Sequence, residues 1–436
     1  MLKHNARLLI VSHFFHPDES IGAQRVSAFA RYFEEWGIPI LVITTRKSPP
    51  SKHIPLHPLP RSIEVYEVDF VHPSIFLDRL RRENSRSDGT VSPKGAHSII
   101  TSFGKRLLAR HSGRIPDRGF TDFWIRTAYR LGKQLVRERN VRWILSSYSP
   151  PASHIIAGRL KERFPRIRWI ADYRDLWIEN HAFPGTFPMT WIEKRLEARF
   201  MPKADLITTT TSPLGSVLEQ KFGPKVQVIW NGFEEGGRAT PGPSLGRNGS
   251  GLEIAYTGTI YPGKCDPLLL MKSLLELKTS GEITPENLRI RFVGRNLEYA
   301  KEQAHAAGVE AFVEFGGLVS LEKSLQIQEE ADALLFLDWL DSSQAGIATG
   351  KIFEYIRWGK PILFLTHGGE NVAREICGRS GLMLAASTVA ECVSSLRSLM
   401  SGAFRVRPDW EYINQFQRKS QIRRLYETIA AMDGAR

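Results

Sequence analysis

Two segments in the second half of the sequence combine a lysine with small residues that let a backbone approach a phosphate. In YTGTIYPGKCDP, Thr259 and Lys264 follow a predicted strand and could cradle a diphosphate, although the GxxxxGK[ST] spacing of a P-loop is absent. In ATGKIFEYIRWGKP, Gly350 opens a predicted helix on which Lys351 and Glu354 share one face. A cation beside a helix N-terminus can pair with a diphosphate, and a carboxylate one turn further can accept two hydrogen bonds from a ribose diol. The alternatives are a solvated lysine and an exposed ion pair worth under about 1 kcal/mol.

Two segments in the first half carry groups that suit phosphate or charge handling. In FHPDESIGAQR, Gly22 lies where the chain turns from a predicted strand into a helix, so its backbone could approach a phosphate at the helix N-terminus. In WIADYRDLW, Asp172 and Asp175 flank Arg174 at the carboxyl end of a buried strand, which suits a reacting centre. The alternatives are a plain loop-to-helix turn and an Arg–Asp network that braces the domain. No GxGxxG is present, so nothing specific indicates a dinucleotide cofactor.

Metal ligands and paired cysteines are sparse in the sequence. His13 and His16 form an HxxH without further ligands, which is weak evidence for a metal. Asp338 and Asp341 follow a predicted strand, where we favour a solvated strand end over a metal-binding acidic pair. We therefore expect no metal and no cofactor. The cysteines lie far apart, which argues against a disulfide scaffold and fits a reducing compartment; they are Cys265, Cys377 and Cys392.

The segments that position these residues alternate between strands and helices. In the first half we expect strands over 7–12, 38–44, 63–68, 143–147, 168–171, 206–210 and 226–230, and helices over 23–36, 124–139, 154–164, 190–200 and 213–221. In the second half we expect strands over 252–256, 289–293, 313–315, 333–337 and 361–365, and helices over 267–277, 297–307, 321–330, 351–357 and 409–432. Strand–helix–strand units with short joints imply parallel sheets with right-handed crossovers.

The chain of 436 residues is long enough for two or three domains. Residues 234–251 (EEGGRATPGPSLGRNGSG) lack apolar periodicity and read as a linker or loop. We predict an α/β protein with two Rossmann-like, doubly wound domains facing a central cleft, an N-terminal domain over 1–233 and a C-terminal domain over 252–408. The last segment, 409–436, is expected to be a helix that packs back on the N-terminal domain. Ligands bind at the carboxyl ends of such sheets.

The charge of the chain favours anionic partners. Lys and Arg number 59 and Asp and Glu 46, a net charge of +13. Between residues 79 and 142 there are sixteen Lys or Arg against five Asp or Glu, interleaved with Phe120, Phe123, Trp124 and Tyr129. Basic and aromatic residues together suit a lipid headgroup interface or nucleic acid, and the alternative is a solvated basic surface. With no signal peptide and no transmembrane run, we expect a cytoplasmic protein that is peripheral on the inner face of the plasma membrane.

The order and spacing of the segments resemble glycosyltransferases of the GT-B fold, in the large retaining family 4, and most closely bacterial enzymes for exopolysaccharide, capsule or O-antigen. The resemblance covers most of the chain. It is carried by FFHPDESIGAQRVSAFARYFEEWGIPILVITT, SSYSPPASHIIAGRLKERFPRIRWIADYRDLW, ADLITTTTSPLGSVLEQKFG, VIWNGF and KIFEYIRWGKPIL.

The resemblance implies roles for individual residues. Glu354 would hold the ribose hydroxyls of a sugar nucleotide, and Lys264, with Thr259 and Lys351, would neutralise the diphosphate leaving group. Arg174 falls where many family members carry a histidine near the anomeric carbon, and it forms the predicted catalytic set with Asp172 and Asp175. The predicted donor-binding set comprises Gly22, Ala23, Gly258, Thr259, Lys264, Arg295, Ala345, Gly346, Lys351 and Glu354.

One departure from the family pattern bears on the donor sugar. Many relatives have a glutamate eight residues before the ribose glutamate, and this chain has Gly346 there. Backbone N–H groups from Ala345 to Ala348 would then contact the sugar.

The resemblance implies a metal-independent, retaining transfer of a sugar from a UDP- or GDP-sugar to a saccharide or lipid-linked acceptor, in cell-surface polysaccharide biosynthesis. Fold-mates of this kind stabilise the departing phosphate with lysine and helix N-termini. One alternative is a sugar-nucleotide 2-epimerase of the same fold. Another, motivated by the charge, is a nucleic-acid-binding protein, but no nucleic-acid motif is present and we expect no nucleic-acid partner.

Overall fold

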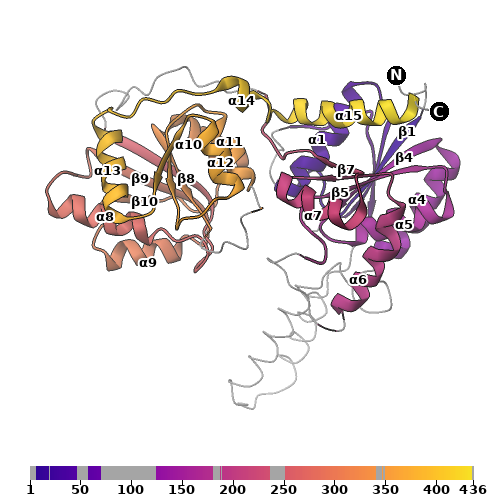
Figure 1. Cartoon of the computed structure of the whole chain (residues 1–436), viewed down its shortest axis with the longest axis horizontal. Helices are drawn as coiled ribbons and strands as arrows, with labels where there is room; N and C mark the ends of the chain where they lie inside the picture. Colours follow the sequence, from indigo (N-terminus) through magenta and orange to yellow (C-terminus); the bar gives the residue numbers. More distant parts are fainter. Residues whose placement is uncertain are drawn as a thin grey trace, which may run out of the picture. The chain divides into compact units, whose positions relative to one another are not determined.

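The computed structural model describes residues 6–18, 20–46, 57–69, 124–179, 187, 189–235, 251–339, 346 and 349–434. The chain forms two compact units, one made of Met1–Ile229 with Arg424–Arg436 and the other of Trp230–Arg423 (Figure 1). The first unit is therefore assembled from two separate stretches of the sequence. Residues 236–250 of the predicted linker, and Phe120 and Phe123, lie outside the described residues.

A seven-stranded sheet forms the centre of the first unit, in the order β3-β2-β1-β4-β5-β6-β7. All its neighbouring strands pair in parallel. β1 and β2 are nearly continuous apolar runs, as expected where both faces of a parallel sheet are covered by helices. The strands are Arg7–Ser12 (β1), Ile40–Thr45 (β2), Glu64–Val68 (β3), Val141–Tyr148 (β4), Arg168–Tyr173 (β5), Leu206–Thr209 (β6) and Val226–Val228 (β7).

Helices cover both faces of this first sheet. One core joins Leu9 and Val11 of β1 to the helices that follow β3, β4 and β6. On the other face lies the helix after β1, whose Phe33 ring is 6.2 Å from that of Tyr426 near the C-terminus. The helices of the unit are Ile21–Glu35 (α1), Trp124–Glu138 (α4), Ala152–Arg163 (α5), Met189–Phe200 (α6), the 3-10 turn Met201–Lys203 (η1), Ser212–Phe222 (α7) and the end of Arg418–Gly434 (α15).

The second unit is built on a six-stranded sheet in the order β10-β9-β8-β11-β12-β13, again with parallel neighbours. Its strands are Leu252–Thr259 (β8), Leu288–Arg295 (β9), Val313–Phe315 (β10), Ala333–Leu337 (β11), Ile362–Leu365 (β12) and Met383–Ala386 (β13).

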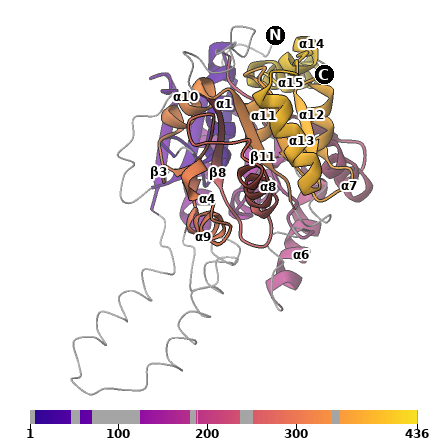
Figure 2. The ribbon, with the colours of Figure 1, turned by 90° about the vertical axis from the view of Figure 1, so that its left-hand side faces the viewer.

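The helices of the second unit also divide between two faces. Leu268–Thr279 (α8), Glu298–Ala306 (α9) and Val389–Met400 (α13) share one core, and α8 and α13 lie side by side in Figure 2. The opposite core takes Leu321–Glu330 (α10), Gly350–Ile356 (α11), Val372–Arg379 (α12) and Trp410–Asn414 (α14). The 3-10 turn Glu310–Phe312 (η3) precedes β10. None of the helices in the described ranges has the length and apolar character needed to cross a bilayer.

Two predicted boundaries in this unit are wrong. β8 runs on through Thr257, Gly258 and Thr259, which we expected in a loop, because its ladder with β9 extends to the pair Thr259 and Arg295. The predicted helix over 409–432 is two helices, α14 and α15. It is interrupted because the backbone there pairs with Phe233, whose N–H donates to the carbonyl of Phe416 (3.1 Å) and whose carbonyl accepts from the N–H of Arg418 (2.7 Å). The sequence reading also missed β13, α12 and α13.

The core of the first unit encloses an imidazole that packs among aromatic rings. His154 of α5 is fully buried and lies 4.9 Å from the ring of Tyr173 and 6.1 Å from that of Trp177. Its Nδ1 lies 2.8 Å from the hydroxyl of Ser146, while its Nε2 has no hydrogen-bond partner among the described residues. Burial lowers the pKa of His154 to about 3. The neutral form is therefore the one that the fold accommodates.

This buried histidine makes the stability of the protein sensitive to acid. The unfolded chain takes up a proton near pH 6.5 and the folded chain only near pH 3, so stability falls as the pH drops below 6.5. Between pH 6.5 and 5, His154 is expected to cost about 2 kcal/mol of the free energy of unfolding. Urea titrations at pH 7 and pH 5 measure this loss. His154→Asn should lower the free energy of unfolding at both pH values, but the difference between pH 7 and pH 5 should shrink by about 2 kcal/mol. A difference as large as that of the unmodified protein would contradict the assignment to His154.

Candidate functional site

The candidate donor residues of the second unit lie where the strand order of the sheet reverses, between β8 and β11. β8 and β11 are neighbours, yet the helix after β8 covers one face and the helix after β11 covers the other. Such a switch point opens a crevice at the carboxyl ends of the two strands, where ligands bind in open α/β sheets. The end of β8, with Gly258 and Thr259, and the first turn of α11, with Lys351 and Glu354, lie at this switch point.

The ammonium of Lys351 is held over the end of β8. Its Nζ lies 3.8 Å from the centre of the Tyr256 ring, and a Cβ placed on Gly258 would come within 2.8 Å of the same Nζ. Gly258, with φ of +138°, therefore leaves the space that this side chain occupies. Burial lowers the pKa of Lys351 to about 8. Among the described residues no acceptor lies within hydrogen-bond or ion-pair distance of its ammonium, so the charge is available to a ligand.

The carboxylate of Glu354 lies one turn further along α11 and is held from one side. Gln328 of α10 donates from Nε2 to Glu354 Oε2 at 3.3 Å. Burial raises the pKa of Glu354, while this hydrogen bond and the positive charges of Arg418, Arg357 and Lys351 oppose the rise. The carboxylate is half-buried, and only its Oε2 accepts a hydrogen bond from Gln328. The remaining acceptor sites can therefore bind the two hydroxyls of a diol.

Gln328 is a residue that the sequence reading missed. Its side chain is fully buried, donates to Thr257 Oγ1 at 2.8 Å and accepts from Trp358 Nε1 at 2.9 Å. It therefore connects β8, α10 and the end of α11 through one amide whose orientation is set on three sides. A single glutamine within a predicted helix gives no sequence signal of this role.

The other predicted donor residues are more exposed. Lys264 is exposed in the loop after β8, and Arg295 is exposed at the end of β9, in register with Thr259. In the same loop, Tyr261 stacks on Trp339 with ring centres 5.4 Å apart. The structure therefore encloses Lys351 more than Lys264. Gly346 is described and half-buried, whereas Asp341, Ala345 and Ala348 lie outside the described residues.

In the first unit, Asp172 is committed to a buried ion pair that the sequence did not predict. The carboxylate is fully buried, and Arg25 of α1 donates to Oδ1 from Nη2 at 2.7 Å and to both oxygens from Nε. Thr208 and Ser147 donate to the two oxygens at 2.7 and 2.9 Å. The partner of Asp172 is thus Arg25 and not Arg174. With its acceptor sites filled, Asp172 has the contacts expected of a brace, which is the alternative that the sequence left open, and its catalytic role stays a prediction.

Arg174 is half-buried at the switch point of the first unit, between β1 and β4. Its Nε donates to the carbonyl of Tyr148 at 2.6 Å and its Nη2 to that of Ser149 at 3.1 Å. A Cβ on Gly22 would lie 1.8 Å from Arg174 Nη1, so Gly22 is needed for the guanidinium to lie against the start of α1. Burial lowers the pKa of Arg174. Within the described chain no carboxylate lies at ion-pair distance from it, although the charges of Asp175 and Asp172 act on it and oppose the effect of burial.

The remaining predicted residues of this unit are Ala23, Asp175, His13 and His16. The N–H of Ala23 is used within the helix cap, where it donates to Ser20 Oγ at 3.3 Å. Asp175 is half-buried next to Arg174, and His13 and His16 follow β1. In the described ranges of the chain, no group of three or more His, Cys, Asp or Glu side chains is arranged to hold a metal ion.

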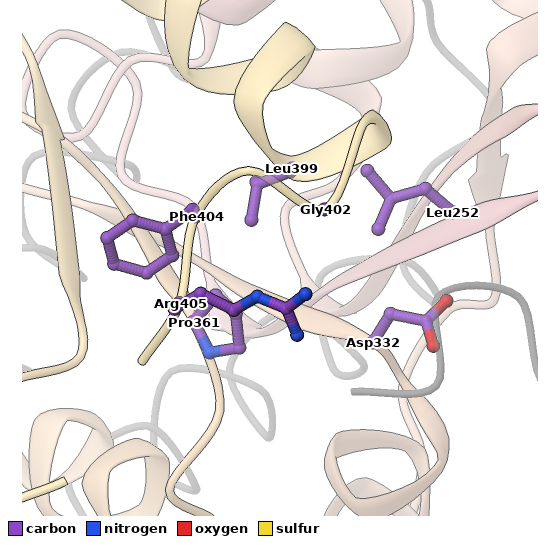
Figure 3. Close-up of a pocket in the computed structure, with 7 residues that line it drawn as sticks. All are labelled: Leu252, Asp332, Pro361, Leu399, Gly402, Phe404 and Arg405. Carbon is purple, nitrogen blue, oxygen red and sulfur yellow. The ribbon is translucent and has the colours of Figure 1, made fainter. Parts of the chain in front are cut away.

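A small pocket in the second unit lies at the amino ends of the strands, away from the candidate site (Figure 3). Leu252, Asp332 and Pro361 line it at the amino ends of β8, β11 and β12. Its cavity volume of about 20 Å³ holds little more than one water. Because ligands bind at the carboxyl ends of such sheets, this pocket is separate from the candidate site. Its other lining residues are Leu399, Gly402, Phe404 and Arg405.

No protein-family model matches the chain, and no curated protein sequence does. Solved structures match over nearly the whole length. A lipopolysaccharide outer core galactosyltransferase, WaaB, has a TM-score of 0.60 at 12% identity, covering 98% of this chain and 99% of its own. A trehalose-6-phosphate protein from E. coli, bound with UDP-2-fluoro glucose, has a TM-score of 0.59 at 12% identity over 98% and 99%.

A UDP-N-acetylglucosamine 2-epimerase is also similar, with a TM-score of 0.52 at 14% identity over 99% of this chain and 97% of that one. At such low identity these likenesses establish architecture. They confirm that this chain has the GT-B fold of two Rossmann-like α/β domains, as the sequence predicted.

Proposed function

We propose that the protein is a nucleotide-sugar-dependent, retaining glycosyltransferase. One observation carries the proposal: Lys351 and Glu354 lie one turn apart on α11 at the switch point of the second sheet, the ammonium without an acceptor among the described residues and the carboxylate held by Gln328. A cation for a diphosphate and an acceptor for a ribose diol are the two groups that recognise a nucleoside diphosphate. The similar galactosyltransferase and UDP-sugar complex have the same fold.

The proposed reaction moves a sugar and releases the nucleoside diphosphate. The bond between the anomeric carbon and the diphosphate oxygen breaks, and the diphosphate leaves with the electron pair. A hydroxyl oxygen of the acceptor bonds to the anomeric carbon, and its proton passes to an oxygen of the departing diphosphate. Lys351 stabilises the charge that grows on the departing diphosphate, which is the kind of interaction that contributes most to such catalysis. Arg174 is the candidate cation of the first unit, and no metal or other cofactor takes part.

The finer assignments follow the resemblance. The donor is a UDP- or GDP-sugar, and the acceptor is a saccharide or a lipid-linked saccharide used in cell-surface polysaccharide biosynthesis. The proposed location is the cytoplasm, at the inner face of the plasma membrane. The net charge of +13 supports a partner with anionic groups.

The assignment of Glu354 to the ribose is tested by comparing nucleotides that differ in one hydroxyl. UDP or GDP, whichever raises the melting temperature more, is compared with its 2′-deoxy and 3′-deoxy forms by calorimetry. We expect the unmodified protein to bind at least one deoxy form about 10- to 100-fold more weakly, since a hydrogen bond to a charged group contributes about 1.5–3 kcal/mol. Glu354→Ala should bind all three with nearly equal affinity, because it lacks the acceptor.

Gln328 provides an independent check of the same site. Gln328→Leu removes the donor that orients Glu354, so we expect it to reduce the discrimination against deoxy nucleotides by about three- to tenfold while Lys351 still binds the diphosphate. Trp358→Phe is the control, since it removes a hydrogen bond to Gln328 without touching Glu354. Equal discrimination in the unmodified protein and Glu354→Ala would show that the ribose is held elsewhere.

The epimerase of the same fold defines a second candidate function. Epimerisation needs no acceptor, so incubation with the donor alone separates the two reactions. Release of nucleoside diphosphate only in the presence of an acceptor supports the transferase, and a new epimer of the donor without acceptor supports the epimerase.

A further inference from the structure

Helix α4 of the first unit carries a straight row of cations on its outer side. Arg126, Arg130, Lys133 and Arg137 are spaced by four, three and four residues, which places them within about 60° of the helix circumference and along about 16 Å. The opposite side of α4 is buried, from Trp124 to Leu135, so the row is fixed in direction.

The row on α4 has no acidic counterpart in the described part of the chain. Arg126, Arg130 and Arg137 are exposed, and none of them forms an ion pair with a described residue. The ammonium of Lys133 lies 5.7 Å from the ring of Tyr129. Side chains of like charge repel one another at these spacings, so the row is unfavourable in isolation unless an anionic partner covers it.

Helix α6 also has a basic outer side, and its acidic side chains point inward. Its carboxylates, Glu193 and Glu197, are buried, and its outer side presents Trp191, Lys194 and Arg195. Trp191 is 49% exposed, and the guanidinium carbon of Arg195 lies 3.5 Å from the centre of its ring. An exposed tryptophan under an arginine is an amphipathic pair suited to the headgroup level of a bilayer.

The two helices belong to one layer. α5 lies between them, in contact with both, and the three helices follow one another in Figure 1. The carboxylate that α5 presents outward, Glu162, is neutralised by Arg199 and Lys203 at 3.0 and 3.1 Å. The outer side of the layer therefore keeps six cations without a described carboxylate partner, namely Arg126, Arg130, Lys133, Arg137, Lys194 and Arg195.

We propose that this outer side of α4 and α6 docks on an anionic lipid bilayer. Each lysine or arginine near an anionic bilayer contributes about 1 kcal/mol, so six are enough for stable peripheral binding. Cations spread over two helices match a charged plane better than a single strand of nucleic acid. The exposed ring that could stack on a base, Trp191, is already covered on one side by Arg195. The inference deepens the proposed function by placing the enzyme where a lipid-linked acceptor resides.

Vesicle sedimentation tests the proposal with the full chain. Vesicles of phosphatidylcholine with 30 mol% phosphatidylglycerol, roughly the anionic fraction that gives a strong surface potential, are compared with pure phosphatidylcholine. We expect binding to the anionic vesicles only, weakening steeply with salt. Arg130→Gln combined with Arg137→Gln should weaken it about 30-fold, since each lost charge costs about fivefold.

A matched variant separates this surface from net charge. Lys272 and Lys301 are exposed cations of the second unit without an ion pair to a described residue, and changing both to Gln removes the same charge. This control should bind within about twofold of the unmodified protein. Equal weakening of both double variants, or no binding at low salt, overturns the proposal.

Two further outcomes are decisive. Tighter binding of the same surface to duplex or single-stranded nucleic acid than to the vesicles would assign it to nucleic acid instead. The thermal shift with UDP or GDP is measured on each variant. An unchanged shift with lost vesicle binding is the expected result, so that failure of docking and failure of nucleotide recognition are distinguished.

Discussion

Replacing Lys351 with methionine is expected to lower glycosyl transfer by about 10²- to 10³-fold, the usual effect of removing one preorganised group that stabilises a developing oxyanion. The ammonium is half-buried over Tyr256 and has no acceptor among the described residues, so the departing diphosphate would be its principal partner. Turnover of the donor with a saccharide acceptor measures the loss, and addition of EDTA should leave the unmodified rate unchanged.

The pH dependence of nucleotide binding identifies the same lysine. Its pKa of about 8 means that the ammonium loses its proton as the pH rises through 8. Affinity for UDP or GDP should therefore change little between pH 7 and 8 and fall by up to about tenfold per unit above it. The terminal phosphate, with a pKa near 6, is already ionised throughout this range.

The variant Lys351→Arg is the control for this pH profile. A guanidinium keeps its positive charge at high pH, so the fall in affinity above pH 8 should disappear. A decline that persists in Lys351→Arg, or a Lys351→Met protein with full nucleotide affinity, would move the diphosphate contact to another residue such as Lys264.

Replacing Asp172 with alanine is expected to destabilise the first unit by about 3–5 kcal/mol, because it leaves the buried guanidinium of Arg25 without its counter-charge. Thr208 and Ser147 would also lose their acceptor. The measurement is the free energy of unfolding from a urea titration that resolves the transition of this unit.

A double variant distinguishes a brace from a catalytic group. Arg25→Met with Asp172→Leu removes both charges together, so it should recover much of the lost stability. If Asp172 acts only as a brace, the folded double variant should keep most of its turnover. A stable double variant without turnover would restore Asp172 to the catalytic set.

The fold could be predicted from the sequence because its signals are local. β1 and β11 match the predicted bounds, since runs such as LLIV and ALLFL are apolar at every position. The ends of elements depend on distant pairing instead. β8 continues to Thr259 because β9 continues beside it, and no pattern within YTGT announces this.

The candidate site was predictable to the level of its segments but not of its individual partners. Lys351 and Glu354 are three residues apart on one helix, so their proximity follows from helix geometry. Arg25 and Asp172 are 147 residues apart, and nothing near either residue specifies the pairing. Arg174 is only two residues from Asp172 in sequence but does not form an ion pair with it in the described chain. Gln328 joins the site only because three elements converge on its amide.

The divided sequence of the first unit has a consequence for how the protein is made. Trp143 Nε1 donates to Asp433, and the ring of Trp36 lies 5.2 Å from that of Tyr426. Both partners emerge from the ribosome only after the whole of Trp230–Arg423 has been translated. The continuous second unit can thus complete its core during synthesis, whereas the first must wait for α15 to pack beside Trp36 and Trp143. During that delay the side chains that α15 later covers are exposed, and exposed apolar surface of this kind favours aggregation unless it is shielded.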